Sequence, residues 1–138
     1  AETALRVSEE EIANGQADAF AYYNQGWAQL QLEQYEAAAA SFDQARSIGL
    51  PFRYFWYEFA PFEAYLAIER YQDVIDLANV ELINAGDTIS IEEWYYYAGL
   101  AYEGLGNTQR ALINYEVAVA RNYNFSAAAD RIVALQNP

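Results

Sequence analysis

Apolar residues recur at helical spacing along most of the chain, and short polar or glycine-containing segments interrupt them. The clearest example is 91–121, in which Trp94, Ala98 and Ala101 share one helical face before an interruption at 104–107. The same period restarts after the interruption. This pattern predicts a helical hairpin with a glycine-rich corner.

Similar patterns predict helices on both sides of this hairpin. Asp18 is suited to cap the start of one helix and Asn124 the start of the last, while Gly49 and Gly86 are suited to end two others. The expected helices outside the hairpin cover 2–14, 19–33, 35–47, 71–85 and 125–135.

Two capping-box patterns, serine followed three residues later by glutamate, bear on where helices begin. Ser90 with Glu93 is expected to open the first helix of the 91–121 hairpin. Ser8 with Glu11 would start the first helix later than residue 2, and we expect the longer helix instead.

Pro61 lies inside the aromatic stretch that follows Pro51. A proline has no N–H to donate and disfavours helical angles in the residue before it, which here is Ala60. We therefore expect a kink or a short break between two helical pieces at this point.

Overlaying three hairpins gives a repeat slightly above 34 residues long. Two of the three positions where paired helices should cross combine small residues, which allows close backbone approach. The crossing pairs are Gly26 with Ala38, Phe62 with Val74, and Gly99 with Ala111.

This pattern resembles the tetratricopeptide repeat, in which an aromatic residue and a glycine mark the first helix and alanines flank an aromatic in the second. The middle copy departs from it, with Phe62 in place of glycine, Glu81 in place of alanine, and Pro61. The matching residues are Tyr22, Gly26, Ala38, Phe42 and Ala45 in the first copy, and Tyr95, Gly99, Tyr102, Ala111, Tyr115 and Ala118 in the third.

The resemblance implies an all-α, TPR-like superhelix of three helical hairpins with an extra N-terminal helix and a C-terminal capping helix. We expect a single domain over 1–138. Its parts are an N-terminal helix at 1–15, repeat 1 at 19–50, a divergent repeat 2 at 51–86, repeat 3 at 90–122 and a capping helix at 124–136.

A second resemblance involves 49–79, GLPFRYFWYEFAPFEAYLAIERYQDVIDLAN. This block is similar to the repeat-containing tails of bacterial, exported multidomain proteins that also carry a papain-like C39 peptidase domain. The resemblance implies an accessory domain whose peptidase neighbour, with the cysteine nucleophile, lies elsewhere in the same parent protein. The chain contains no methionine, and its Ala1-Glu2-Thr3 start is compatible either with cleavage after a signal peptide or with a domain cut from a longer protein. Of these two we expect the domain cut, with an extracytoplasmic origin.

Charge and composition exclude several function classes. Seven arginines against 20 acidic residues give a net charge of −13, which repels nucleic acid and anionic membrane surfaces and attracts basic partners. Cysteine and histidine are both absent, so thiol or histidine catalysis and thiolate or imidazole metal sites are excluded within these 138 residues. There is also no apolar run of transmembrane length.

No enzymatic activity, metal or cofactor is expected. Glu58 with Glu63, and Glu92 with Glu93, are the closest candidate acid–base pairs, but 20 acidic residues bring some together by chance. Glu9 to Glu11 lack the loop of spaced oxygen ligands that a calcium site requires, and a solvated helix face explains them better.

The family resemblance implies a concave groove, lined by the first helix of each repeat, that binds extended peptides or partner helices. Aromatic and acidic side chains dominate the groove positions, which favours apolar, proline-rich or basic protein segments. A cell-wall glycan is an alternative ligand, and a purely structural or oligomerisation role is a third possibility. The groove positions are Tyr23, Asn24, Trp27, Gln31, Trp56, Phe59, Glu63, Tyr96, Leu100 and Glu103.

Other aromatic residues are expected in the core. They occupy signature positions of the first and third copies, where their rings would fill the space between paired helices. These residues are Tyr22, Phe42, Tyr95, Tyr102 and Tyr115.

Overall fold

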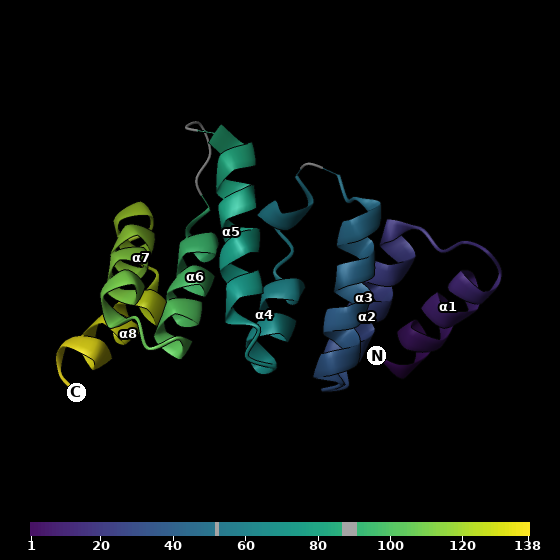
Figure 1. The fold of residues 1–138 in the computed structure, drawn as a ribbon, viewed down its shortest axis with the longest axis horizontal. Coiled ribbons are helices and arrows are strands. Elements are labelled where there is room, and N and C mark those ends of the chain that lie inside the picture. Colours follow the sequence, from purple (N-terminus) through teal and green to yellow (C-terminus); the bar gives the residue numbers. More distant parts are fainter. Residues whose placement is uncertain (52, 87–90) are drawn as a thin grey trace. The chain divides into compact units, whose positions relative to one another are not determined.

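The protein is all-helical, as its periodicity predicts. A computed structural model describes residues 1–51, 53–86 and 91–138, and within these ranges it contains eight α-helices, one 3₁₀ helix and no strand (Figure 1). None of the helices described is both long enough and apolar enough to cross a membrane.

The chain forms two compact units, Ala1–Ile68 and Glu69–Pro138. In the first unit α1 packs on α2, α2 packs on α3, and α4 packs on both α2 and α3. The elements of this unit are α1 (Glu2–Ala13), α2 (Ala19–Gln31), α3 (Tyr35–Ile48), the 3₁₀ helix η1 (Tyr54–Trp56) and α4 (Ala60–Ala67).

The second unit continues with four helices packed in chain order, α5 on α6, α6 on α7, and α7 on α8. The unit boundary falls inside the expected second repeat, so α4 belongs to the first unit and α5 to the second. A single domain over 1–138 stays a prediction. The helices are α5 (Tyr71–Ala85), α6 (Glu92–Gly104), α7 (Thr108–Arg121) and α8 (Ser126–Gln136).

Most helix ends lie where polar and glycine residues predict them. The Asp18 carboxylate accepts a 2.8 Å hydrogen bond from the backbone N–H of Ala21. Gly49 and Gly86 follow α3 and α5 with φ of 108° and 64°, left-handed values that glycine adopts without strain. The Ser90 capping box lies outside the described residues.

Ser8 lies in the middle of α1, so its capping-box pattern does not mark a helix start. Its hydroxyl donates a 2.8 Å hydrogen bond to the carbonyl oxygen of Leu5, inside the same helix. The expected longer first helix is therefore confirmed.

Asp18→Ala should lower the free energy of unfolding by about 1 kcal/mol, because it leaves the N–H of Ala21 without its capping acceptor. Urea denaturation followed by circular dichroism measures the effect. Asp18→Asn, which can still cap, serves as the matched control and should stay close to wild type. Equal stability of Asp18→Ala and the wild type would contradict this role for the cap.

Two expectations about helix starts are wrong. Ala60 does adopt helical geometry, since α4 begins there and places Pro61 in the first turn, where a missing N–H removes no intrahelical bond. The expected break lies before α4, and the piece preceding it is only the short 3₁₀ helix η1. At the other end, Phe125 rather than Asn124 is the N-cap of α8, without a side-chain hydrogen bond.

Glycine and aromatic residues pack together in the same way in the first and third hairpins. A Cβ added to Gly26 would lie 2.8 Å from the ring of Phe42, and one added to Gly99 would lie 2.4 Å from the ring of Tyr115. Both pairs are separated by 16 residues. Each glycine therefore lets the aromatic ring of the returning helix lie directly against the first helix.

The expected core aromatics differ in burial. Phe42 and Tyr115 are fully buried, whereas Tyr22, Tyr95 and Tyr102 are only partly buried. Tyr22, Tyr95 and Tyr102 therefore lie at the periphery of the hydrophobic core.

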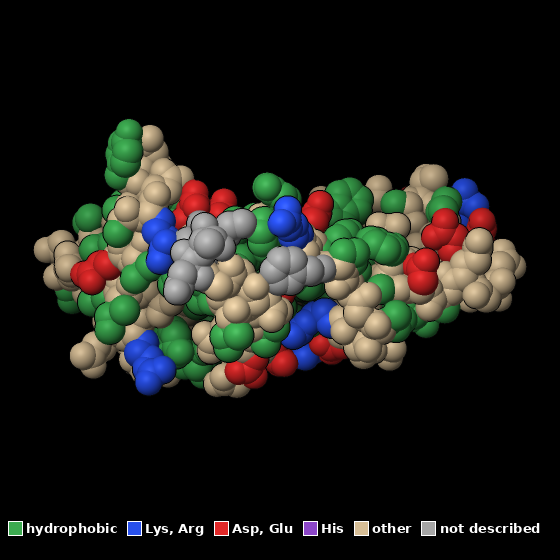
Figure 2. Space-filling view, turned by 90° about the horizontal axis from the view of Figure 1, so that it is seen from above, with side chains coloured by type: hydrophobic (Ala, Val, Ile, Leu, Met, Phe, Trp, Pro, Cys, Tyr) green, Lys and Arg blue, Asp and Glu red, His purple; other side chains and the backbone are tan. Residues whose placement is uncertain are grey.

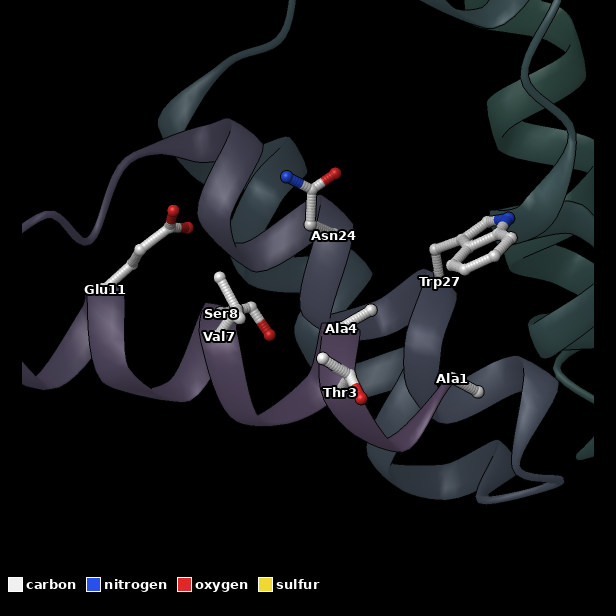
Figure 3. Close-up of a pocket in the computed structure, with 8 residues that line it drawn as sticks. All are labelled: Ala1, Thr3, Ala4, Val7, Ser8, Glu11, Asn24 and Trp27. Atoms are coloured by element: carbon white, nitrogen blue, oxygen red, sulfur yellow. The ribbon is translucent and has the colours of Figure 1, made fainter.

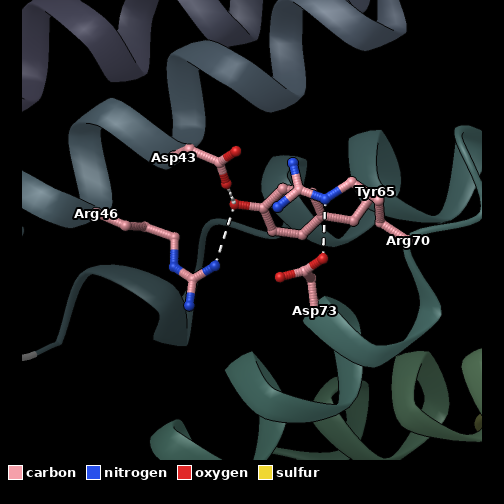
Figure 4. A network of polar contacts seen from close by, with 5 residues as sticks. All are labelled: Asp43, Arg46, Tyr65, Arg70 and Asp73. Carbon is pink, nitrogen blue, oxygen red and sulfur yellow. Dashed lines mark hydrogen bonds and ion pairs between the residues drawn. The ribbon is translucent and has the colours of Figure 1, made fainter.

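A polar network joins α4 to α3 in the first unit (Figure 4). The Tyr65 hydroxyl donates to the Asp43 carboxylate at 2.7 Å and accepts from Arg46 Nη1 at 3.1 Å. Burial is the main cause that raises the pKa of Tyr65 to about 12. Figure 4 also shows the Arg70–Asp73 ion pair, at 2.8 Å, of the second unit.

Candidate binding site

An open cleft lies between α1 and α2 in the first unit. Its volume is about 550 Å³. Figure 3 shows that α1 supplies most of the lining and α2 supplies an amide and an indole. The lining residues are Ala1, Thr3, Ala4, Val7, Ser8, Glu11, Asn24 and Trp27.

Trp27 is the exposed tryptophan of the chain. Its exposed fraction is 42%, against 8% for Trp56 and 0% for Trp94. Val7, across the cleft on α1, is also exposed. The cleft thus combines an open indole and an aliphatic side chain with the Asn24 amide and the Glu11 carboxylate, a mixture suited to holding a partly apolar ligand.

Two of the predicted groove residues in the first unit are buried instead. Tyr23 packs edge-on against Tyr54, with ring centroids 4.7 Å apart, and its hydroxyl donates to Glu58 at 3.4 Å. Trp56 is covered because η1 turns it inward, and Arg53 lies over its ring at 4.9 Å. Tyr23 and Trp56 are therefore not exposed as groove-lining residues would be, and the groove itself stays a prediction.

The other predicted residues of this unit reach the surface to different degrees. Gln31 and Glu63 are exposed, and Phe59 is partly buried against Phe62 at a centroid distance of 6.3 Å. None of these lines the α1–α2 cleft. Asn24 and Trp27 are the two predicted residues that the cleft brings together.

Phe20, Tyr54 and Glu58 form a surface that the sequence did not single out, called here the acidic aromatic patch. Phe20 is 45% exposed and packs edge-on against Tyr54, at a centroid distance of 5.7 Å. The carboxylate of Glu58 is exposed beside them. Phe20 precedes Trp27 by two helical turns. This spacing is the sequence signal that could have identified Phe20 as a residue on the same exposed face of the helix.

The negative charge of Glu58 acts on two neighbouring tyrosines. Burial, and secondarily the negative charge of Glu58, raises the pKa of both Tyr23 and Tyr54. A carboxylate close to two phenol rings makes this surface attractive to cations.

The predicted groove residues of the second unit lie against its core. Tyr96 packs on Tyr115 and Phe125, with centroid distances of 6.0 Å and 5.1 Å, and Leu100 packs against the same cluster. Leu100 and Glu103 also line a shallow cleft of about 420 Å³ with Gly104 and Arg131.

The groove prediction treated Glu103 as an acidic group available to a ligand. In the structure its carboxylate is already paired. Its carboxylate accepts a 2.8 Å hydrogen bond from the Tyr115 hydroxyl and forms an ion pair with Arg131, whose Nε lies at 3.1 Å. Arg131 lies on α8, whereas Glu103 lies on α6. The spacing of residues within α6 therefore could not predict this ion pair. The second cleft is therefore close to neutral.

In the described ranges no group of three or more acidic side chains has an arrangement that could hold a metal ion. Glu92 accepts a 2.9 Å hydrogen bond from the Asn122 amide, and burial raises the pKa of Glu93.

On the face shown in Figure 2, hydrophobic side chains are exposed between Asp and Glu side chains.

Comparison with models of known families, with curated proteins and with solved structures gives no match.

Proposed function

We propose that this protein is a non-catalytic binding module whose first unit holds an extended peptide segment in the α1–α2 cleft, with Trp27 as the main anchor. The main support for this proposal is the open cleft of about 550 Å³ in which a tryptophan remains 42% exposed. A rigid indole loses little conformational freedom on binding, so exposed tryptophans often dominate binding energy. The resemblance to tetratricopeptide repeats supports a peptide as the ligand.

Charge favours a peptide that is apolar and basic. The first unit carries ten acidic residues and three arginines. Arg6 pairs with Glu10 at 2.7 Å, and Arg46 donates to Tyr65, so two of these arginines already have partners within the unit. A basic segment would be attracted to such a surface, and an acidic one repelled.

Fluorescence titration tests the proposal, because Trp27 is the tryptophan in contact with solvent. The probes are three tryptophan-free synthetic peptides: one leucine- and arginine-rich, one proline-rich, and one in which glutamate replaces arginine. An N-acetylglucosamine oligomer is the fourth probe. We expect the first two peptides to change the fluorescence, and the glutamate peptide and the glycan to have no effect.

Trp27→Ala should weaken binding of the responding peptide roughly tenfold or more, measured by anisotropy of a labelled peptide. Its melting temperature should stay near wild type, since the indole is half exposed. Tyr123→Ala is the matched control, because this ring is 85% exposed on the second unit. A response to the glycan alone would replace the proposal with carbohydrate binding, and no response to any probe would contradict it.

A further inference from the structure

One stripe of α2 carries both the cleft anchor Trp27 and Phe20, the member of the acidic aromatic patch that lies on this helix. Phe20, Asn24 and Trp27 follow each other at spacings of four and three residues, so they share one face of the helix. Phe20 and Trp27 are seven residues apart, which corresponds to about 10 Å along the helix axis. A ligand lying along α2 would meet both.

The aromatic rings of this protein repeatedly hold guanidinium groups. Arg46 lies over Tyr65 at 5.7 Å and Arg53 over Trp56 at 4.9 Å in the first unit. In the second unit Arg110 lies over Tyr102 at 5.5 Å, and Arg121 over Tyr95 at 5.1 Å. Such contacts are favourable because the ring face is negative.

The acidic aromatic patch also offers aromatic rings to a guanidinium group, but no arginine in the described part of the chain occupies it. Within the described ranges no arginine lies over Phe20 or Tyr54, and none forms an ion pair with Glu58. The Glu58 carboxylate accepts a long 3.4 Å hydrogen bond from the Tyr23 hydroxyl. This leaves an exposed carboxylate beside a half-exposed ring.

We infer that the peptide held by the α1–α2 cleft places an arginine or lysine side chain on the acidic aromatic patch, against Phe20 and Tyr54 and paired with Glu58. This inference rests on the proposed function and specifies its ligand. An extended peptide advances about 3.3 Å per residue, so the 10 Å between the two anchors corresponds to about three residues. The recognised segment is thus an apolar residue and a basic residue three positions apart.

A peptide series tests both the charge and the spacing. Labelled peptides carry one leucine and one arginine separated by one, three or six positions in a serine and glycine background, and a fourth replaces the arginine of the middle peptide with citrulline. Citrulline keeps the shape of arginine and removes its charge. We expect the three-position arginine peptide to bind roughly tenfold more tightly than its citrulline counterpart.

Glu58→Gln should reduce that arginine preference to near unity while leaving citrulline-peptide binding unchanged. Glu36→Gln, an exposed carboxylate in the first turn of α3, alters net charge equally and should retain the preference. Both residues are exposed, so circular dichroism should show unchanged folding.

The possible failures are distinct. If peptides bind through Trp27 but wild type does not prefer arginine, or Glu58→Gln keeps the preference, the basic subsite is wrong and the peptide-binding function stands. If spacing has no effect, the extended arrangement along α2 is wrong. If no peptide of the series binds, the proposed function fails with it.

Discussion

Gly99→Leu is expected to lower the free energy of unfolding by about 3 kcal/mol or more, at the upper end of overpacking effects. Even a Cβ at this position would lie 2.4 Å from a carbon of the Tyr115 ring. That ring is fully buried, and its hydroxyl is held by Glu103 at 2.8 Å, so it has little room to move. The smallest side chain is therefore required where α6 meets α7.

A double-mutant cycle identifies the ring as the cause. Gly99→Ala should already destabilise the protein, although alanine by itself favours a helix by about 1 kcal/mol over glycine. In a Tyr115→Leu background the same alanine should cost less, since the clashing ring is gone. Urea denaturation of the four proteins gives the coupling energy. A Gly99→Ala protein more stable than wild type would overturn this packing account.

Stability is expected to fall steeply above about pH 10, because three buried tyrosines resist ionisation. Burial is the largest cause that raises the pKa of Tyr23, Tyr65 and Tyr115, and for Tyr65 the pKa rises to about 12. In the unfolded chain a tyrosine ionises near pH 10. The folded pKa values lie higher, so the stabilisation is complete below the unfolded pKa and is lost as pH rises through the folded values.

Urea denaturation at a series of pH values from about 8 to about 12 measures this effect, and phenolate absorbance follows ionisation. Tyr115→Phe should make the decline shallower, because it removes one of the three titrating groups. Tyr123→Phe is the control, since an 85% exposed ring should leave the slope unchanged. Constant stability across the range would show that these hydroxyls are not held in their protonated form.

Local sequence signals predicted the helices well because their causes are local. The N-cap Asp18 and the stops Gly49 and Gly86 act within one turn of the chain, and α5 has the predicted bounds 71–85. The expectation that Ala60 leaves the helix failed because Pro61 lies in a first turn, where it is tolerated.

Site residues were predicted less well because their exposure depends on elements distant in sequence. Trp27 and Asn24 line a cleft, but this cleft is formed largely by α1, which the groove prediction did not include, and the groove itself stays a prediction. Tyr23 is covered by Tyr54 from η1, and Glu103 is neutralised by Arg131 from α8.

The sequence by itself determined the all-helical class, the hairpin pattern and a strongly acidic chain, since periodicity, capping and charge are properties of neighbouring residues or of composition. Tertiary structure decided which aromatic rings and carboxylates remain available. Packing buries Tyr23 and Trp56, pairs Glu103, and leaves Phe20, Trp27 and Glu58 at the surface. Burial and pairing arise from contacts between helices, and no periodicity within one helix encodes them.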